Sequence, residues 1–72
     1  MILIIYSQNK LEDILEVICR HFPDAILQHH FKSRESMWFE NMPQVVSLRD
    51  LQDLQKDFEK ADILAYSIQL VE

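Results

Sequence analysis

The stretch AILQHHFKSRESMWFEN, residues 25–41, decides the fold of this chain. Apolar and polar residues alternate in residues 25–32 and in residues 35–41, a pattern typical of strands that bury one face. We therefore predict a β-hairpin in which Lys32 pairs with Ser36 across a three-residue loop. That register sorts the side chains into two faces, with Leu27, His29, Phe31, Met37 and Phe39 on one and Gln28, His30, Ser36, Trp38 and Glu40 on the other.

The sequence before and after the hairpin predicts two further strands and a helix. Residues 1–6 form a short apolar run typical of a buried strand, and residues 63–71 alternate as a final strand. Asn9 is followed three residues later by Glu12, which is the spacing of a helix N-cap and its reciprocal partner. Apolar residues then recur at helical spacing as far as Phe22, so a helix is expected there.

A second helix is expected after Met42-Pro43. Ser47 followed three residues later by Asp50 again has the spacing of a capping box. Just before it, Val45 and Val46 are expected to extend a strand briefly. The core stripe of this helix consists of Leu51, Leu54, Phe58 and Ala61.

The predicted order of elements is strand, helix, strand, strand, helix, strand. This order resembles the ferredoxin-like βαββαβ fold, an α+β two-layer sandwich in which two helices cover one face of an antiparallel sheet. An alternative makes residues 33–40 a short helix, and residues 42–46 then resemble the proline-led strand of glutaredoxin-like domains. Residues 4–7 resemble the first strand of that family, and residues 10–13 stand where the family carries Cys-x-x-Cys. That alternative implies a degenerate thioredoxin- or glutaredoxin-like fold.

The composition predicts one domain, residues 1–72, and excludes several classes of function. The chain has no glycine, so phosphate-cradling loops, dinucleotide fingerprints and nucleophile elbows are excluded. Its single cysteine, Cys19, has no disulfide partner and is expected to be a small core residue in a reducing, cytoplasmic setting. The formal charge of −5 argues against direct contact with nucleic acid, and no apolar run is long enough for a membrane span.

Few residues have a spacing that predicts chemistry. His29 and His30 are adjacent on a predicted strand, so their side chains point to opposite faces and do not share a metal ion. We expect no catalytic residue, no metal and no cofactor. The second helix carries Asp50, Asp53 and Asp57 within about 60° of one another. Because Arg49, Lys56 and Lys60 form an adjacent stripe, we expect solvated ion pairs there.

The predicted sheet leaves one face without helices, and that face is apolar. The first strand is apolar on both sides, and His30 and Trp38 add aromatic rings to the free face. A patch of this kind marks an interface when it is large enough. We expect a homodimer, or a protein partner with a basic surface, with these residues as anchors or steering charges: Tyr6, His30, Met37, Trp38, Asp50, Asp53 and Asp57.

The sequence therefore favours a small acidic protein-interaction module over an enzyme. Such a module binds or occludes a protein partner, as inhibitors, antitoxins and immunity proteins of phages and plasmids do. One alternative is a small dimeric, metal-dependent, nuclease-like enzyme of the ferredoxin-like fold, with Asp24 or Glu40 near the dimer seam. Another is a sensor that binds a small ligand at that seam.

Overall fold

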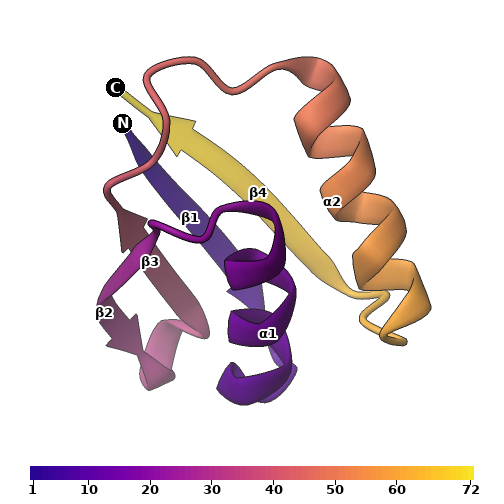
Figure 1. Ribbon diagram of the computed structural model, residues 1–72. Coiled ribbons are helices and arrows are strands. Elements are labelled where there is room, and N and C mark those ends of the chain that lie inside the picture. The colour runs from indigo at the N-terminus through magenta and orange to yellow at the C-terminus, as the bar shows by residue number, and fades with distance from the viewer.

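The computed structural model describes residues 1–72 as four strands, two α-helices and one short 3-10 turn. In chain order these elements are β1 (Ile2–Ser7), α1 (Leu11–His21), β2 (Ile26–Phe31), the 3-10 turn η1 (Lys32–Arg34), β3 (Ser36–Glu40), α2 (Leu48–Lys60) and β4 (Tyr66–Val71). Figure 1 shows that the two chain ends lie side by side, as the pairing of Ile2 with Val71 requires.

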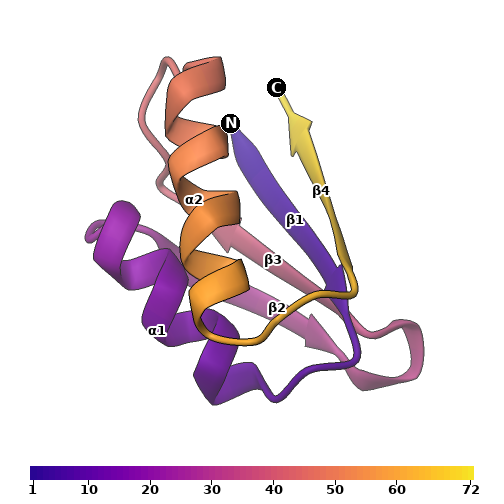
Figure 2. The same cartoon turned by 90° about the vertical axis from the view of Figure 1, so that its right-hand side faces the viewer.

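The four strands form one antiparallel sheet in the order β2-β3-β1-β4. Both helices cover the same face, and the other face is uncovered (Figure 2). The fold is therefore ferredoxin-like, as the order of elements predicted. The glutaredoxin-like alternative is wrong, because residues 36–40 form a strand and residues 43–46 form a loop. The brief strand expected at Val45 and Val46 is absent for the same reason.

The β2–β3 hairpin has a different register from the predicted one. Phe31, not Lys32, pairs with Ser36, and the turn between them closes through η1 and Glu35. At the far end of the hairpin Leu27 pairs with Phe39. Between these two pairs β2 has one residue more than β3, so the ladder shifts between Leu27 and His29 in a β-bulge.

The bulge reverses the sides that were expected for the end of β2. His30 pairs with the buried Met37 and so lies on the helix-covered side, whereas His29 pairs with Trp38 on the uncovered side. Phe31 also lies on the uncovered side, because it pairs with Ser36. The predictions that His29 and Phe31 face the core and that His30 faces outward are therefore wrong.

Three turns place a residue other than glycine in the left-handed backbone conformation. Glu35, Asn41 and Asp62 have φ angles of 53°, 60° and 61°, in the left-handed region that glycine usually occupies. Asn41 and Asp62 suit these positions, because short polar side chains tolerate this conformation best. Asn41 Nδ2 also donates a hydrogen bond of 2.9 Å to the Asp24 carbonyl oxygen. Glu35 has no such side-chain advantage.

The two helix starts differ in their capping. Ser47 and Asp50 form the predicted capping box: Asp50 N donates to Ser47 Oγ over 3.1 Å, and Ser47 N donates to Asp50 Oδ2 over 3.0 Å. The N-cap of α1 is Lys10, and no side chain caps it. The prediction for Asn9 is wrong, because Asn9 instead exchanges hydrogen bonds with the Ser7 hydroxyl at the end of β1.

The core lies between the helices and the covered face of the sheet. It combines β1 and β3 with the inner stripes of the helices, through Leu3, Ile5, Ile14, Val17, Ile18, Phe22, Met37, Phe39, Met42, Leu54, Phe58 and Ile63. Cys19 is exposed, so its expected place in the core is wrong.

Candidate functional site: the uncovered face of the sheet

The uncovered face of the sheet is the most distinctive surface of the molecule. The strand registers place these side chains on it: Ile2, Ile4, Tyr6, Ile26, His29, Phe31, Ser36, Trp38, Glu40, Ser67, Gln69 and Val71. The group contains three large aromatic rings, one carboxylate and no lysine or arginine. Depletion of charge together with enrichment in aromatic residues is the composition of the centre of a protein–protein interface.

Three rings on this face pack into one cluster, formed by His29, Phe31 and Trp38. The His29 and Phe31 rings stack with their centroids 5.4 Å apart. Trp38 meets both of them edge-on, with its centroid 5.9 Å from His29 and 5.5 Å from Phe31. These arrangements are favourable for aromatic pairs and hold the rings in fixed positions on the strands. The bulge in β2 builds this cluster, since a regular strand would send the first two rings into the core.

Tyr6 and Gln69 lie on β1 and β4, across the sheet from the cluster. The Tyr6 hydroxyl donates to Gln69 Oε1 over 3.4 Å, and the Tyr6 side chain remains 38% exposed. Phe31 is 37% exposed, and Trp38 is half-buried. Ile4 lies between β3 and β4 and is buried. The face therefore presents rigid, partly exposed aromatic anchors on a packed apolar floor.

The residues predicted to form an interface do not share one surface. Tyr6 and Trp38 lie on the uncovered face. Met37 is 1% exposed and belongs to the core, so its expected place as a surface anchor is wrong. His30 lies on the helix-covered side and lines a shallow cavity of about 290 Å³ with Ser7, Asn9 and Lys10.

The three acids of α2 lie in the helical layer, away from the uncovered face. Asp50 caps its own helix, and the hydrogen bond from the Ser47 backbone N–H is the main cause that lowers the pKa of its carboxyl, with the Ser47 side chain acting in the same direction. Asp53 is exposed. The ion pairs expected along α2 do not form within the helix, and Asp57 pairs with Arg20 and His21 of α1 instead.

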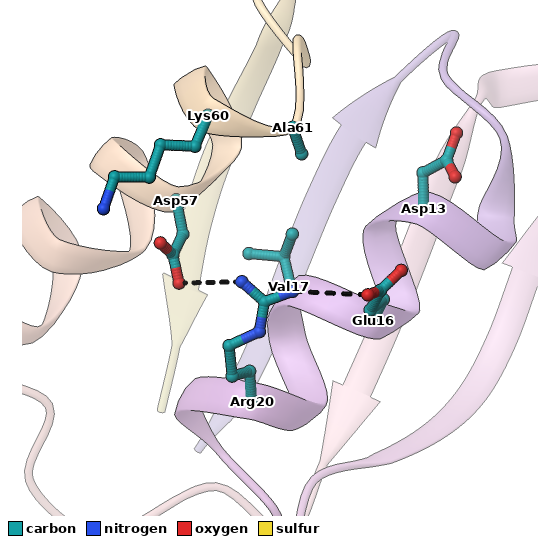
Figure 3. A pocket seen from close by; sticks show the side chains of 7 residues that line it. All are labelled: Asp13, Glu16, Val17, Arg20, Asp57, Lys60 and Ala61. Atoms are coloured by element: carbon teal, nitrogen blue, oxygen red, sulfur yellow. Dashed lines mark hydrogen bonds and ion pairs between the residues drawn. The ribbon is translucent and has the colours of Figure 1, made fainter.

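Asp57 joins the two helices at a crevice of about 320 Å³ (Figure 3). His21 Nε2 donates to Asp57 Oδ2 over 2.6 Å, and Arg20 lies 3.3 Å from the same oxygen. Arg20 also reaches Glu16 one turn earlier on α1, at 3.4 Å. The hydrogen bond from His21 is the main cause that lowers the pKa of Asp57, and the positive charges nearby act in the same direction.

Charge pairs hold the side chains of this crevice in place. The residues that line it are Asp13, Glu16, Val17, Arg20, Asp57, Lys60 and Ala61, and none of them is a serine, threonine or cysteine nucleophile. The structure brings no group of three His, Cys, Asp or Glu side chains together for a metal ion. Asp24 and Glu40, the acids of the nuclease-like alternative, lie in the turn before β2 and at the end of β3.

His29 and Phe31 are the functional candidates that the sequence analysis placed on the wrong face. The alternation through Leu27, His29 and Phe31 is unbroken in the sequence, so it carries no signal of the bulge. Only the position of the turn, which moves the first pair of the hairpin to Phe31 and Ser36, reveals it.

Comparisons with protein-family models, with curated proteins and with solved structures found no match to this chain. Neither helix has the length and apolar character that crossing a membrane requires. The fold and the surface together define a class, a two-layer α+β module with an aromatic, charge-poor sheet face.

Proposed function

We propose that this chain is a protein-interaction module that binds a basic protein partner through the uncovered face of its sheet. The observation that carries the proposal is the ring cluster of His29, Phe31 and Trp38 on a face that has one carboxylate and no lysine or arginine. Rigid aromatic side chains that are already packed lose little conformational entropy on binding, so they make efficient anchors. A role as an inhibitor, antitoxin or immunity protein fits this mode of action.

The charge distribution supports a basic partner. The chain has a formal charge of −5, and its acids lie mainly on α1, α2 and the turns. A negative protein attracts a positive one over distances of about 10 Å at moderate salt, which raises the rate of encounter. The charge-poor face then supplies the apolar contact, while the net negative charge of the chain favours a basic partner over an acidic one.

The experiment begins with the tagged full chain as bait in an extract of the source cell. Proteins retained by the wild type are identified, expressed and purified, and their affinities are measured by calorimetry at two salt concentrations. The key variant is Trp38→Asp, which places a charge in the centre of the face. Asp53→Asn, a substitution in the helical layer, is the control, and circular dichroism confirms that each variant is folded.

We expect one purified partner with a positive net charge. Its affinity should fall at least about 30-fold for Trp38→Asp, as for an interfacial hot spot, and should change less than about threefold for Asp53→Asn. Higher salt should weaken binding. The proposal is overturned if the wild type retains no protein specifically, if the retained protein binds Trp38→Asp equally well, or if only a second copy of this chain occupies the face.

A further inference from the structure

The two edges of the sheet differ in how well they are protected against pairing. The β2 edge is interrupted by the bulge between Leu27 and His29. The β4 edge has six residues, YSIQLV, with no charge, no proline and no break in its pairing with β1. A charged residue follows each edge strand directly, Lys32 after β2 and Glu72 after β4. Bulges, charged residues and prolines within the strand are the usual devices that prevent an edge strand from pairing with another chain. β2 has the bulge, and β4 has none of these devices along its length.

The backbone of β4 determines what kind of group pairs with it. In an antiparallel ladder every second residue directs its N–H and C=O toward the neighbouring strand, and the residues between direct theirs away. β1 satisfies one set, so the other set points outward along an edge about 20 Å long. A regular row of alternating donors and acceptors is complementary to another extended strand.

We propose that β4 pairs antiparallel with β4 of a second copy of this chain, so that the two sheets become one continuous sheet. Directly opposite residues in such a ladder share a face. A register centred on Ile68 or on Gln69 therefore joins the two covered faces and the two uncovered faces. Because β4 has no charged residue, neither register places like charges opposite each other.

The side of α2 that faces away from α1 fits this arrangement. Asp57 marks the side of α2 that contacts α1. At about 100° per residue, four residues lie roughly 140–180° around the helix from it: Leu48, Gln52, Gln55 and Glu59. The ring of Phe58, the residue before Glu59, lies 4.7 Å from the ring of Tyr66 at the start of β4. The C-terminal part of α2, and this stripe with it, therefore lies next to β4.

A second copy is the occupant that this stripe favours. The stripe contains a single charge, and Leu48 is 72% exposed on it. Across a two-fold axis the two α2 helices would run antiparallel, so Glu59 of one copy would lie near the Leu48 end of the other. The charged residues of α2 that contact α1 lie on the other side of the helix and take no part in the dimer contact. A standard interface buries about 1,600 Å² in total, and one strand pair with two helix stripes reaches only the lower end of the range. We therefore expect a micromolar dissociation constant.

The test is the oligomeric state of the full chain in sedimentation equilibrium from about 1 to 500 μM, a range chosen to bracket micromolar affinities. Ser67→Lys/Gln69→Lys places lysines opposite each other or next to each other in either register. The control, Gln28→Lys/Gln44→Lys, adds the same charge at the opposite edge and in a loop. Trp38→Asp separates edge pairing from association through the uncovered face. Circular dichroism establishes that all variants are folded.

We expect the wild type, the control and Trp38→Asp to be dimers at high concentration, and the β4 variant to remain a monomer. A monomeric wild type at 500 μM overturns the inference, as does a β4 variant that still forms dimers. If Trp38→Asp is the monomer, the dimer forms through the uncovered face instead. Open-ended fibres of the wild type would also contradict a closed dimer. The partner binding proposed above does not depend on this dimer, because it is measured separately with Trp38→Asp.

Discussion

At the scale of single residues, the most informative position is Glu35, which closes the β2–β3 hairpin in a left-handed conformation. Its φ of 53° and ψ of 36° bring its Cβ close to the backbone, which costs about 1–2 kcal/mol for an ordinary residue. Glu35→Gly removes the Cβ but adds entropy to the unfolded chain, so we expect a net gain of about 0.5–1 kcal/mol in the free energy of unfolding. Urea denaturation measures it. Glu35→Ala is the control, since it keeps the Cβ, and an equal gain from alanine would refute the argument.

Asp57 is a residue at which the contact between the helices makes stability depend on pH. Its pKa is lowered in the folded state, so its contribution to stability is present above its ordinary value of 3.8 and is lost as the pH falls through the lowered pKa. Asp57→Asn removes the charge that His21 and Arg20 contact. We expect the variant to be less stable than the wild type at pH 7, and the difference to disappear as the pH approaches 2.

The measurement for Asp57 is a series of thermal or urea unfolding curves between pH 7 and pH 2 for both proteins. The matched control is Asp53→Asn, on an exposed part of the same helix, which should follow the wild-type profile. If the stability of Asp57→Asn coincides with that of the wild type at every pH, the contact between the helices contributes nothing to stability.

At the scale of elements, the capping box makes the start of α2 well defined. Ser47→Ala removes the hydroxyl that accepts from Asp50 N, and the loss of such an N-cap costs about 1 kcal/mol. Equilibrium unfolding in urea measures the change. Ser33→Ala, a substitution at an exposed serine in η1, is the control and should change the free energy of unfolding by less than about 0.5 kcal/mol.

The elements also show which parts of this structure a sequence predicts. The capping box of α2 depends on two residues three apart, so its spacing in the sequence was sufficient. The apolar runs likewise predicted all four strands and their order. The cap of α1 failed, because the Ser7 hydroxyl competes for Asn9. The bend after β1 decides which partner Asn9 contacts. The spacing of Asn9 and Glu12 in the sequence gives no information about that bend.

The bulge in β2 is the feature that sequence alternation predicted least well, and it decides the candidate site. Packing fixes Leu27 opposite Phe39, and the tight turn fixes Phe31 opposite Ser36. Each constraint arises from a different part of the hairpin, and they disagree by one residue, so a bulge must form between them. The uncovered face was predicted correctly as apolar, but two of its three clustered rings came from residues that were assigned to the core.

At the scale of the whole molecule, one small core must supply nearly all the stability. At about 0.05–0.15 kcal/mol per residue, a chain of 72 residues is expected to have a free energy of unfolding of about 4–11 kcal/mol. Phe58 is fully buried between α2 and β4, where its ring lies 4.7 Å from that of Tyr66. Phe58→Ala should cost about 3–5 kcal/mol, a large fraction of the total.

A second substitution of phenylalanine by alanine, on the uncovered face of the sheet, distinguishes residues needed for folding from residues available for binding. Phe31 packs against the rings of His29 and Trp38 and is 37% exposed, so we expect Phe31→Ala to cost less than about 1.5 kcal/mol. Calorimetric unfolding at a concentration where the chain is monomeric compares the two variants. Equal losses would mean that the ring cluster is a second core needed for folding. A small loss for Phe31→Ala would mean that the monomer folds without this ring, as a face available for the proposed partner requires.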